Sequence, residues 1–196
     1  MDFADVLRLR KAVRNYLPDP IPRETVERIV ARGRKAPSGG FSQGLRLVVV
    51  TDTETRGSLA TMAGEPEYVE LGFEPWISRA PVHIVLCTRE EDYHERYRQP
   101  DKLQEDGTEI DWPVPYWYVD AGAAMMLLML AAIDEGLASG VFGVLDWQPL
   151  KGLLGIPADV TPLAVLTVGK PAPETRKGSA RRGWKPLEEV VRWERW

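Results

Sequence analysis

Cysteine and histidine are scarce in this sequence of 196 residues, which contains one cysteine and two histidines. The single cysteine, Cys87, excludes an intrachain disulfide framework and a cysteine-rich metal site. His83 and His94 leave too few imidazoles for a typical zinc site. We therefore expect no bound metal, and we expect His83 and Cys87, both in an apolar stretch, to be packed side chains.

An excess of positive charge is also missing, because the formal net charge is −4. A general nucleic-acid-binding protein would be basic, so we expect no nucleic-acid partner. The longest apolar run, Ala121 to Ile133, is shorter than the roughly 20 residues that span a bilayer. The opening MDFADVLRLR contains acids and no apolar core of a signal peptide. These features predict a cytoplasmic protein that does not enter the membrane.

Common catalytic motifs are absent as well. The sequence contains no G-x-S-x-G, no P-loop and no G-x-G-x-x-G that opens a helix after a strand. The acids between Glu90 and Glu95 form a charge run, which is typical of a solvated face.

The patterns that are present predict helices mixed with strands. Proline at 18, 20 and 22 ends a first helix expected over 2–14, and a second helix is expected to end before Pro37. Further helices are expected over 53–62 and 116–137 and after Asp146, and strands over 45–51, 81–88 and 161–171, with a short strand or turn over 140–146. This order favours an α+β sandwich over a doubly wound sheet. The polar stretch 89–115 is long enough to be a lid, a binding loop or a mobile segment.

The stretch RKAVRNY places three cations within five residues. In a helix, Arg10 and Arg14 would be like-charged neighbours, which costs about 0.2–0.5 kcal/mol, and no acid lies three or four positions from any of the three cations. The cluster is therefore either solvated or binds an anion supplied from elsewhere. Two further features could bind an anion, a loop of small residues at 38–44 and the pair Arg181 and Arg182. Together with the cluster they favour a phosphorylated cofactor.

Five stretches, in this order, resemble the nitroreductase family of FMN-dependent oxidoreductases over most of the chain. They are RKAVRNYLPDPIP, APSGGFSQGLRLVVVTD, DAGAAMMLLMLAAIDEGLASGVFG, LLGIPADVTPLAVLTVGKP and WKPLEEVV. The resemblance implies one α+β domain over 1–196, with a central mixed or antiparallel sheet flanked by helices. It also implies a domain-exchanged homodimer with FMN in two interface clefts, a lid or substrate loop at 89–115, and a tail at 172–196 that reaches the partner subunit.

The resemblance also implies roles for particular residues. Arg10, Arg14 and Arg181 or Arg182 would hold the FMN phosphate, and Lys11 would contact the phosphate or the ribityl and pyrimidine side. Pro37 to Gly39 would lie along the isoalloxazine edge, and the backbone of 140–143 would pass its N5 side. The full cofactor-binding set is Arg10, Lys11, Ala12, Arg14, Pro37, Ser38, Gly39, Gln43, Gly140, Val141, Phe142, Gly143, Arg181 and Arg182.

The expected activity is hydride transfer from NADPH or NADH, through flavin N5, to a small aromatic electron acceptor such as a nitro compound or a quinone, by a ping-pong mechanism. Because the flavin carries the chemistry, we name no catalytic side chain. The acceptor-binding candidates are Phe41, Tyr93, Tyr97, Trp112, Tyr116 and Trp117, which either stack on the acceptor or pack against the partner subunit.

The sequence departs from the family pattern at several of these positions. Ala12 stands where the family prefers serine, Phe41 where it prefers asparagine, and Gly44 and Leu45 where it has Pro-Trp. These departures keep two alternatives open, a flavin storage or sensor protein and a degenerate member with little turnover.

Overall fold

The computed structural model describes residues 1–173 and 182–196. Its centre is a four-stranded antiparallel sheet formed by β1 (Leu45–Val50), β2 (Val82–Thr88), β3 (Ala138–Phe142) and β4 (Thr161–Gly169), in the order β1-β2-β4-β3. The central strands β2 and β4 are almost entirely buried, as expected for their runs of β-branched and aliphatic residues. The sheet and its surrounding helices confirm the predicted α+β class.

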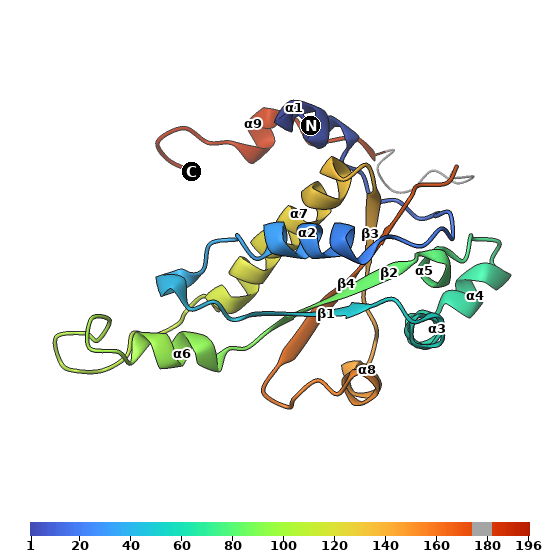
Figure 1. Ribbon diagram of the computed structural model, residues 1–196. Coiled ribbons are helices and arrows are strands. Elements are labelled where there is room, and N and C mark those ends of the chain that lie inside the picture. Colours follow the sequence, from blue (N-terminus) through green and yellow to red (C-terminus); the bar gives the residue numbers. More distant parts are fainter. Residues whose placement is uncertain (174–181) are drawn as a thin grey trace.

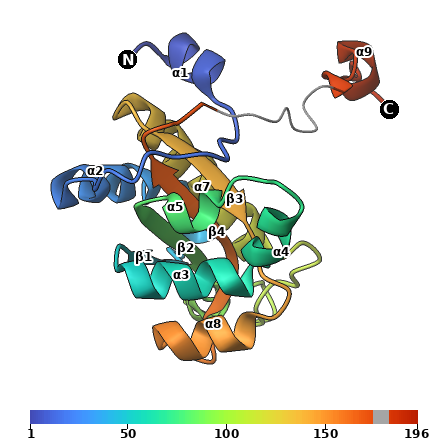
Figure 2. The same cartoon turned by 90° about the vertical axis from the view of Figure 1, so that its right-hand side faces the viewer.

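Helices cover both faces of the sheet (Figures 1 and 2). On one face, α7 (Tyr116–Asp134) contacts all four strands and packs against α2 (Arg23–Gly33) around a core that includes Leu128, Ile84 and Leu166. On the other face, a second core includes Leu59, Val85 and Leu150 and is covered by α3 (Thr53–Met62), α5 (Trp76–Arg79) and α8 (Trp147–Leu154). The shorter helices are α1 (Phe3–Leu9), α4 (Glu65–Glu70), α6 (Glu91–Tyr97), α9 (Leu187–Val190) and the 3-10 turn η1 (Gly39–Phe41).

The long helix α7 is a core helix. Among the described residues, it is the one helix long and apolar enough to cross a membrane by length and composition. Its contacts with the sheet and with α2 account for that apolar composition, because a helix that is apolar nearly all round is buried.

The predicted first helix is wrong beyond Leu9. Arg10 has extended backbone, and the chain from Ala12 onward pairs with the sheet edge through bridges between Ala12 and Ser139 and between Tyr16 and Pro171. This path buries the side chains of Val13 and Tyr16, and the free energy gained by their burial outweighs the helix propensity of the local sequence. Arg10 and Arg14 are therefore not neighbours on a helix.

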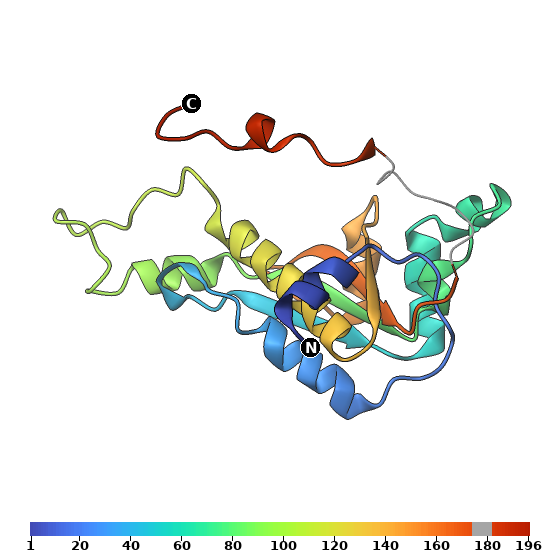
Figure 3. The same ribbon diagram turned by 90° about the horizontal axis from the view of Figure 1, so that it is seen from above.

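The region 89–115 is also more ordered than the sequence predicts, because it begins with α6. Tyr93 is buried and anchors this helix, while acids occupy its first turn, where the helix dipole favours them. The remaining residues, 98–115, form an excursion beyond one end of α7, and α1 lies beside the other end (Figure 3).

Candidate functional site

The first group of candidate residues is the basic segment, residues 10–14, which lies against β3. Val13 N donates to Ser139 O at 3.0 Å. Gly140 is required at this approach, because a Cβ there would collide with Val13 O and would lie 2.9 Å from the Trp76 ring. The segment and β3 are therefore in backbone contact, as the family resemblance requires if both are to touch one cofactor.

Exposure alternates along the basic segment. Val13 and Asn15 are buried, whereas Ala12 and Arg14 face solvent. The Arg10 side chain forms no hydrogen bond or ion pair within the described part of the chain. Two guanidinium groups and an ammonium group in five residues are the donor set that suits a phosphate.

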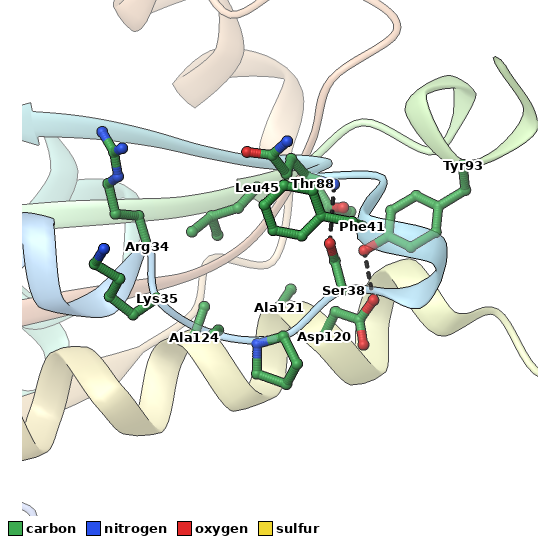
Figure 4. Close-up of a pocket in the computed structure, with 13 residues that line it drawn as sticks. Arg34, Lys35, Ser38, Phe41, Leu45, Thr88, Tyr93, Asp120, Ala121 and Ala124 are labelled. Carbon is green, nitrogen blue, oxygen red and sulfur yellow. Dashed lines mark hydrogen bonds between the residues drawn. The ribbon is translucent and has the colours of Figure 1, made fainter. Parts of the chain in front are cut away.

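The second group surrounds a pocket beside the first half of α7, with a cavity volume of about 450 Å³ (Figure 4). The loop after α2 forms much of it, and the ends of β1 and β2, α6 and the first half of α7 complete it. Its lining residues are Arg34, Lys35, Ala36, Pro37, Ser38, Phe41, Gln43, Leu45, Thr88, Tyr93, Asp120, Ala121 and Ala124.

The loop that lines this pocket holds a strained turn. Phe41 and Gln43 have φ values of 60° and 56°, which residues with side chains seldom adopt. The turn is held by hydrogen bonds from Gly39 N to Asp120 Oδ2 at 2.9 Å and from Gln43 N to Ser38 Oγ at 3.0 Å. Two strained residues within three positions, both lining one pocket, are a recognised mark of a functional site.

Asp120 connects this turn to α6 and α7. Its Oδ2 accepts from Gly39 N and also from the Tyr93 hydroxyl, at 2.8 Å. Burial and this hydrogen bond to Asp120 raise the pKa of Tyr93, so the phenol stays protonated and donating. Asp120 is not recognisable from the sequence, because nothing local signals that a residue inside an apolar helix faces a distant turn.

Aromatic rings pack together beside the pocket. Trp112 lies at the centre, with ring centroids 4.7 Å from Tyr97, 6.0 Å from Tyr93, 5.8 Å from Trp117 and 6.3 Å from Tyr116. Tyr93 and Trp117 are buried in this cluster, whereas Tyr116 is about half exposed. Five of the six predicted acceptor-binding aromatics therefore lie together, and the two buried ones support the others. The sixth, Phe41, lines the pocket at the strained turn and has no ring contact among the described residues.

Glu109 fastens the excursion 98–115 to α6. Its Oε1 lies 2.5 Å from His94 Nδ1 and accepts from Trp112 Nε1 at 2.7 Å, while its Oε2 accepts from Arg98 at 3.1 Å. Burial lowers the pKa of His94, but hydrogen bonds to Glu109 and Glu90 outweigh that effect, and the net pKa is raised.

The two groups do not converge within one chain. The pocket is anchored to α7 at Asp120, whereas the basic segment pairs with Ser139, which follows the last residue of α7, Asp134, in the chain. These α7 positions are fourteen residues apart, which corresponds to roughly 20 Å of helix. Of the predicted phosphate ligands near the end of the chain, Arg182 is exposed and Arg181 lies outside the described residues.

The residues in each group fit the parts of a flavin nucleotide. Beside the basic segment, the hydroxyl of Ser139 is buried and has no hydrogen-bond partner within residues 1–173 and 182–196, next to the backbone that pairs with Ala12. In the pocket, the Thr88 hydroxyl is likewise buried and lacks a partner in the part of the chain that the structure describes, beside the apolar wall of Ala121 and Ala124. Cations with a spare donor suit a phosphate, and the strained turn, where small residues let the backbone approach closely, suits the edge of a flavin ring. The apolar wall of the pocket suits an aromatic acceptor.

Comparison with known proteins identifies the fold and family that the sequence motifs resemble. The family model described as the nitroreductase family matches residues 7–170. The chain is 32% identical to a 5,6-dimethylbenzimidazole synthase of Rhodospirillum rubrum, covering 90% of this chain and 85% of that protein. It is 28% identical to an FMN reductase [NAD(P)H] of Bacillus subtilis, covering 85% of this chain and 65% of that protein.

Solved structures agree. A hypothetical oxidoreductase of Bacillus subtilis, 26% identical, superposes with a TM-score of 0.76 over 98% of this chain and 74% of its own. The sheet order, the backbone contact between β3 and the basic segment, and the match over most of the chain support one conclusion: this chain belongs to the nitroreductase family.

Proposed function

We propose that this protein is an FMN-dependent oxidoreductase that passes hydride equivalents from NADPH or NADH to a small aromatic acceptor. The observation that carries the proposal is the basic segment, residues 10–14, fixed by backbone hydrogen bonds against β3. Relatives named FMN reductase [NAD(P)H] in Bacillus subtilis and NADPH-flavin oxidoreductase in Vibrio harveyi support it. Bound FMN would supply the redox chemistry, hydride acceptance at N5 followed by electron delivery to the acceptor in a ping-pong order.

The protein's part is binding and orientation. Arg10 and Arg14 hold the phosphate, and Lys11 contacts the phosphate or the ribityl and pyrimidine side. The backbone of residues 140–143 borders the N5 side, where N–H donors stabilise developing negative charge. The strained turn that contains Phe41 and Gln43, with the preceding Pro37 to Gly39, borders the ring.

The acceptor binds beside that turn, under residues 89–115, which serve as its lid. Tyr116 is the most accessible aromatic of the neighbouring cluster, so it contacts the acceptor directly. Trp112 and Tyr97 form the next layer, and the buried Tyr93 and Trp117 hold them in place.

Two copies of the chain are needed to complete each site, because the basic segment and the pocket lie near opposite ends of α7. An exposed apolar stripe along α7, formed by Val119, Gly122 and Met126 at helical spacing, provides a face for this homodimer. Within the tail 172–196, Trp184, Trp193 and Trp196 are almost fully exposed and reach over the partner subunit. The dimer works in the cytoplasm.

The first experiment is the absorption spectrum of the purified protein after FMN addition and desalting, repeated anaerobically with NADPH. Retained flavin that bleaches, and whose colour returns on addition of a quinone, is the expected result. Retained flavin that stays oxidised with NADPH and NADH, but is reduced by dithionite, would instead indicate storage or sensing. A colourless protein would contradict the cofactor assignment.

A further inference from the structure

One end of the pocket carries two cations that the proposed function does not use. Arg34 and Lys35 follow α2 directly and line the cavity, and Figure 4 shows them at the end opposite Tyr93 and Asp120. We propose that the acceptor of this pocket is an aromatic compound with an acidic substituent, a carboxylate or a sulfonate, which Arg34 and Lys35 hold. This inference rests on the proposed function.

These two cations differ from their neighbours on α2. Arg28 and Arg32 both bind the carboxylate of Glu135, at 2.7 and 2.8 Å, and Arg23 binds Glu27 at 2.7 Å. Arg34 and Lys35 form no ion pair or hydrogen bond through their side chains within the described part of the chain. The C-terminal end of a helix favours positive charge, but that preference does not require the side chains to line a cavity.

The middle of the pocket suits a flat ring. Ala121 and Ala124 form a wall of small side chains, and Leu45 and Phe41 add apolar surface (Figure 4). The hydroxyl of Thr88, which is 1% exposed, has no hydrogen-bond partner among the described residues and lies in this lining. A volume of about 450 Å³ lies within the range of pockets that bind small molecules.

The opposite end of the pocket sets the orientation of the ligand. The Asp120 carboxylate, held by Gly39 N and the Tyr93 hydroxyl, repels an acidic substituent. A ligand with one acidic group therefore places it at Arg34 and Lys35 and directs its other end toward the turn and the aromatic cluster. The pocket thus discriminates between acidic aromatic acceptors and their neutral analogues.

The test compares 4-nitrobenzoate with its methyl ester, which removes the charge and keeps the ring and the nitro group. Calorimetry measures binding of each compound to the flavin-loaded protein without NAD(P)H. We expect the acid to bind about tenfold more tightly than the ester, since two exposed ion pairs contribute about 1.4 kcal/mol together. The double variant Arg34→Gln/Lys35→Gln should remove this preference, and Arg23→Gln on the same helix should keep it.

The inference is overturned if the acid and the ester bind equally, if neither binds, or if the double variant keeps the preference. It is also overturned if the double variant loses its flavin, because the cations would then belong to the cofactor phosphate. Reduction of a neutral quinone with NADPH tests the proposed function separately. Quinone turnover without acid preference would contradict this inference alone, whereas acid-selective binding by a protein that cannot use NADPH or NADH would contradict the proposed function alone.

Discussion

Arg14 is the residue whose assignment is most directly testable. It is exposed between the buried Val13 and Asn15, so its side chain can change without disturbing the core. If it holds the FMN phosphate, Arg14→Ala should lower flavin affinity by about 1.5–3 kcal/mol, the scale of a hydrogen bond to a charged group. Fluorescence titration with FMN measures this change. Arg8→Ala, on α1, is the control, and unchanged flavin affinity in the Arg14 variant would remove this residue from the phosphate site.

Gly140 limits how closely β3 and the basic segment can approach. An added Cβ would collide with Val13 O, which belongs to backbone and cannot rotate away. We expect Gly140→Ala to lower the free energy of unfolding by about 1–3 kcal/mol, the usual cost of overpacking. Thermal or urea unfolding measures it.

Gly57 provides the matched control for Gly140. It lies inside α3, and a Cβ there meets nothing within 4 Å. Gly57→Ala should therefore raise the free energy of unfolding by about 0.5–1 kcal/mol, because alanine is the better helix former. Similar effects of the two substitutions would show that the packing at Gly140 is not tight.

At the residue scale, the sequence identifies site residues that lie within short motifs and misses those brought in by tertiary contacts. Pro37, Ser38, Phe41 and Gln43 all line the pocket, as the loop motif indicates. Asp120 and Thr88 line it too, but one lies in an apolar helix and the other ends a buried strand. Their relevance depends on which turn lies opposite them, and no local pattern carries that information.

Elements are predictable where a cap or a strong pattern marks them. Asp52 and Asp146 accept hydrogen bonds from the first turns of α3 and α8, and Gly155 ends α8 with positive φ, so both helices are confirmed. The first helix is wrong beyond Leu9 because bridges to β3 and to Pro171 bury Val13 and Tyr16. Local sequence periodicity does not reveal that this segment can pair with backbone more than a hundred residues away instead of continuing the helix.

The attachment of residues 98–115 to α6 should depend on pH through His94 and Glu109. The pKa of His94 is raised above its ordinary 6.5, so its contribution is complete below 6.5 and is lost as pH rises through the raised value. Burial raises the pKa of Glu109, but hydrogen bonds from Trp112 and His94 outweigh that effect and the net pKa lies below 4.5. The contribution of Glu109 is therefore complete above 4.5 and is lost as pH falls through the depressed value.

The attachment should accordingly be tightest between about pH 4.5 and 6.5. Hydrogen exchange of residues 98–115, corrected for the intrinsic pH dependence, should show weaker protection at about pH 9 than at about pH 6. A local readout is needed because burial lowers the pKa of His83, on the other face of the sheet, to about 4. That shift reduces global stability as pH falls below 6.5. His94→Gln should abolish the local difference, and equal protection at both pH values in the unaltered protein would contradict the role of this pair.

For the whole molecule, the family resemblance predicts the architecture better than the element patterns do. Five motifs in order indicate the nitroreductase fold, and the antiparallel sheet with helices on both faces agrees. The same motifs do not reveal that the basic segment and the pocket lie near opposite ends of α7, because the order of motifs along a chain does not give their separation in space. That separation implies that two chains share two sites.

If each site takes its basic segment from one chain and its pocket from the other, two defective chains can complement each other. Arg10→Ala/Arg14→Ala removes the first group, and Ser38→Trp fills the second. Each homodimer should bind no flavin. In a heterodimer of the two, one site contains both defects and the other contains neither. Random pairing after co-expression should therefore restore flavin at about a quarter of all sites.

The purified heterodimer, isolated through two different tags, should hold about one flavin per dimer, measured by absorbance. A site built within one chain gives the opposite result, because every chain in the heterodimer then carries one defect and no flavin is retained. If either variant keeps its flavin as a homodimer, the residues substituted in that variant do not belong to the flavin site. The experiment therefore separates an error in the residues from an error in how the chains combine, and an unaltered homodimer with two flavins is the reference for both.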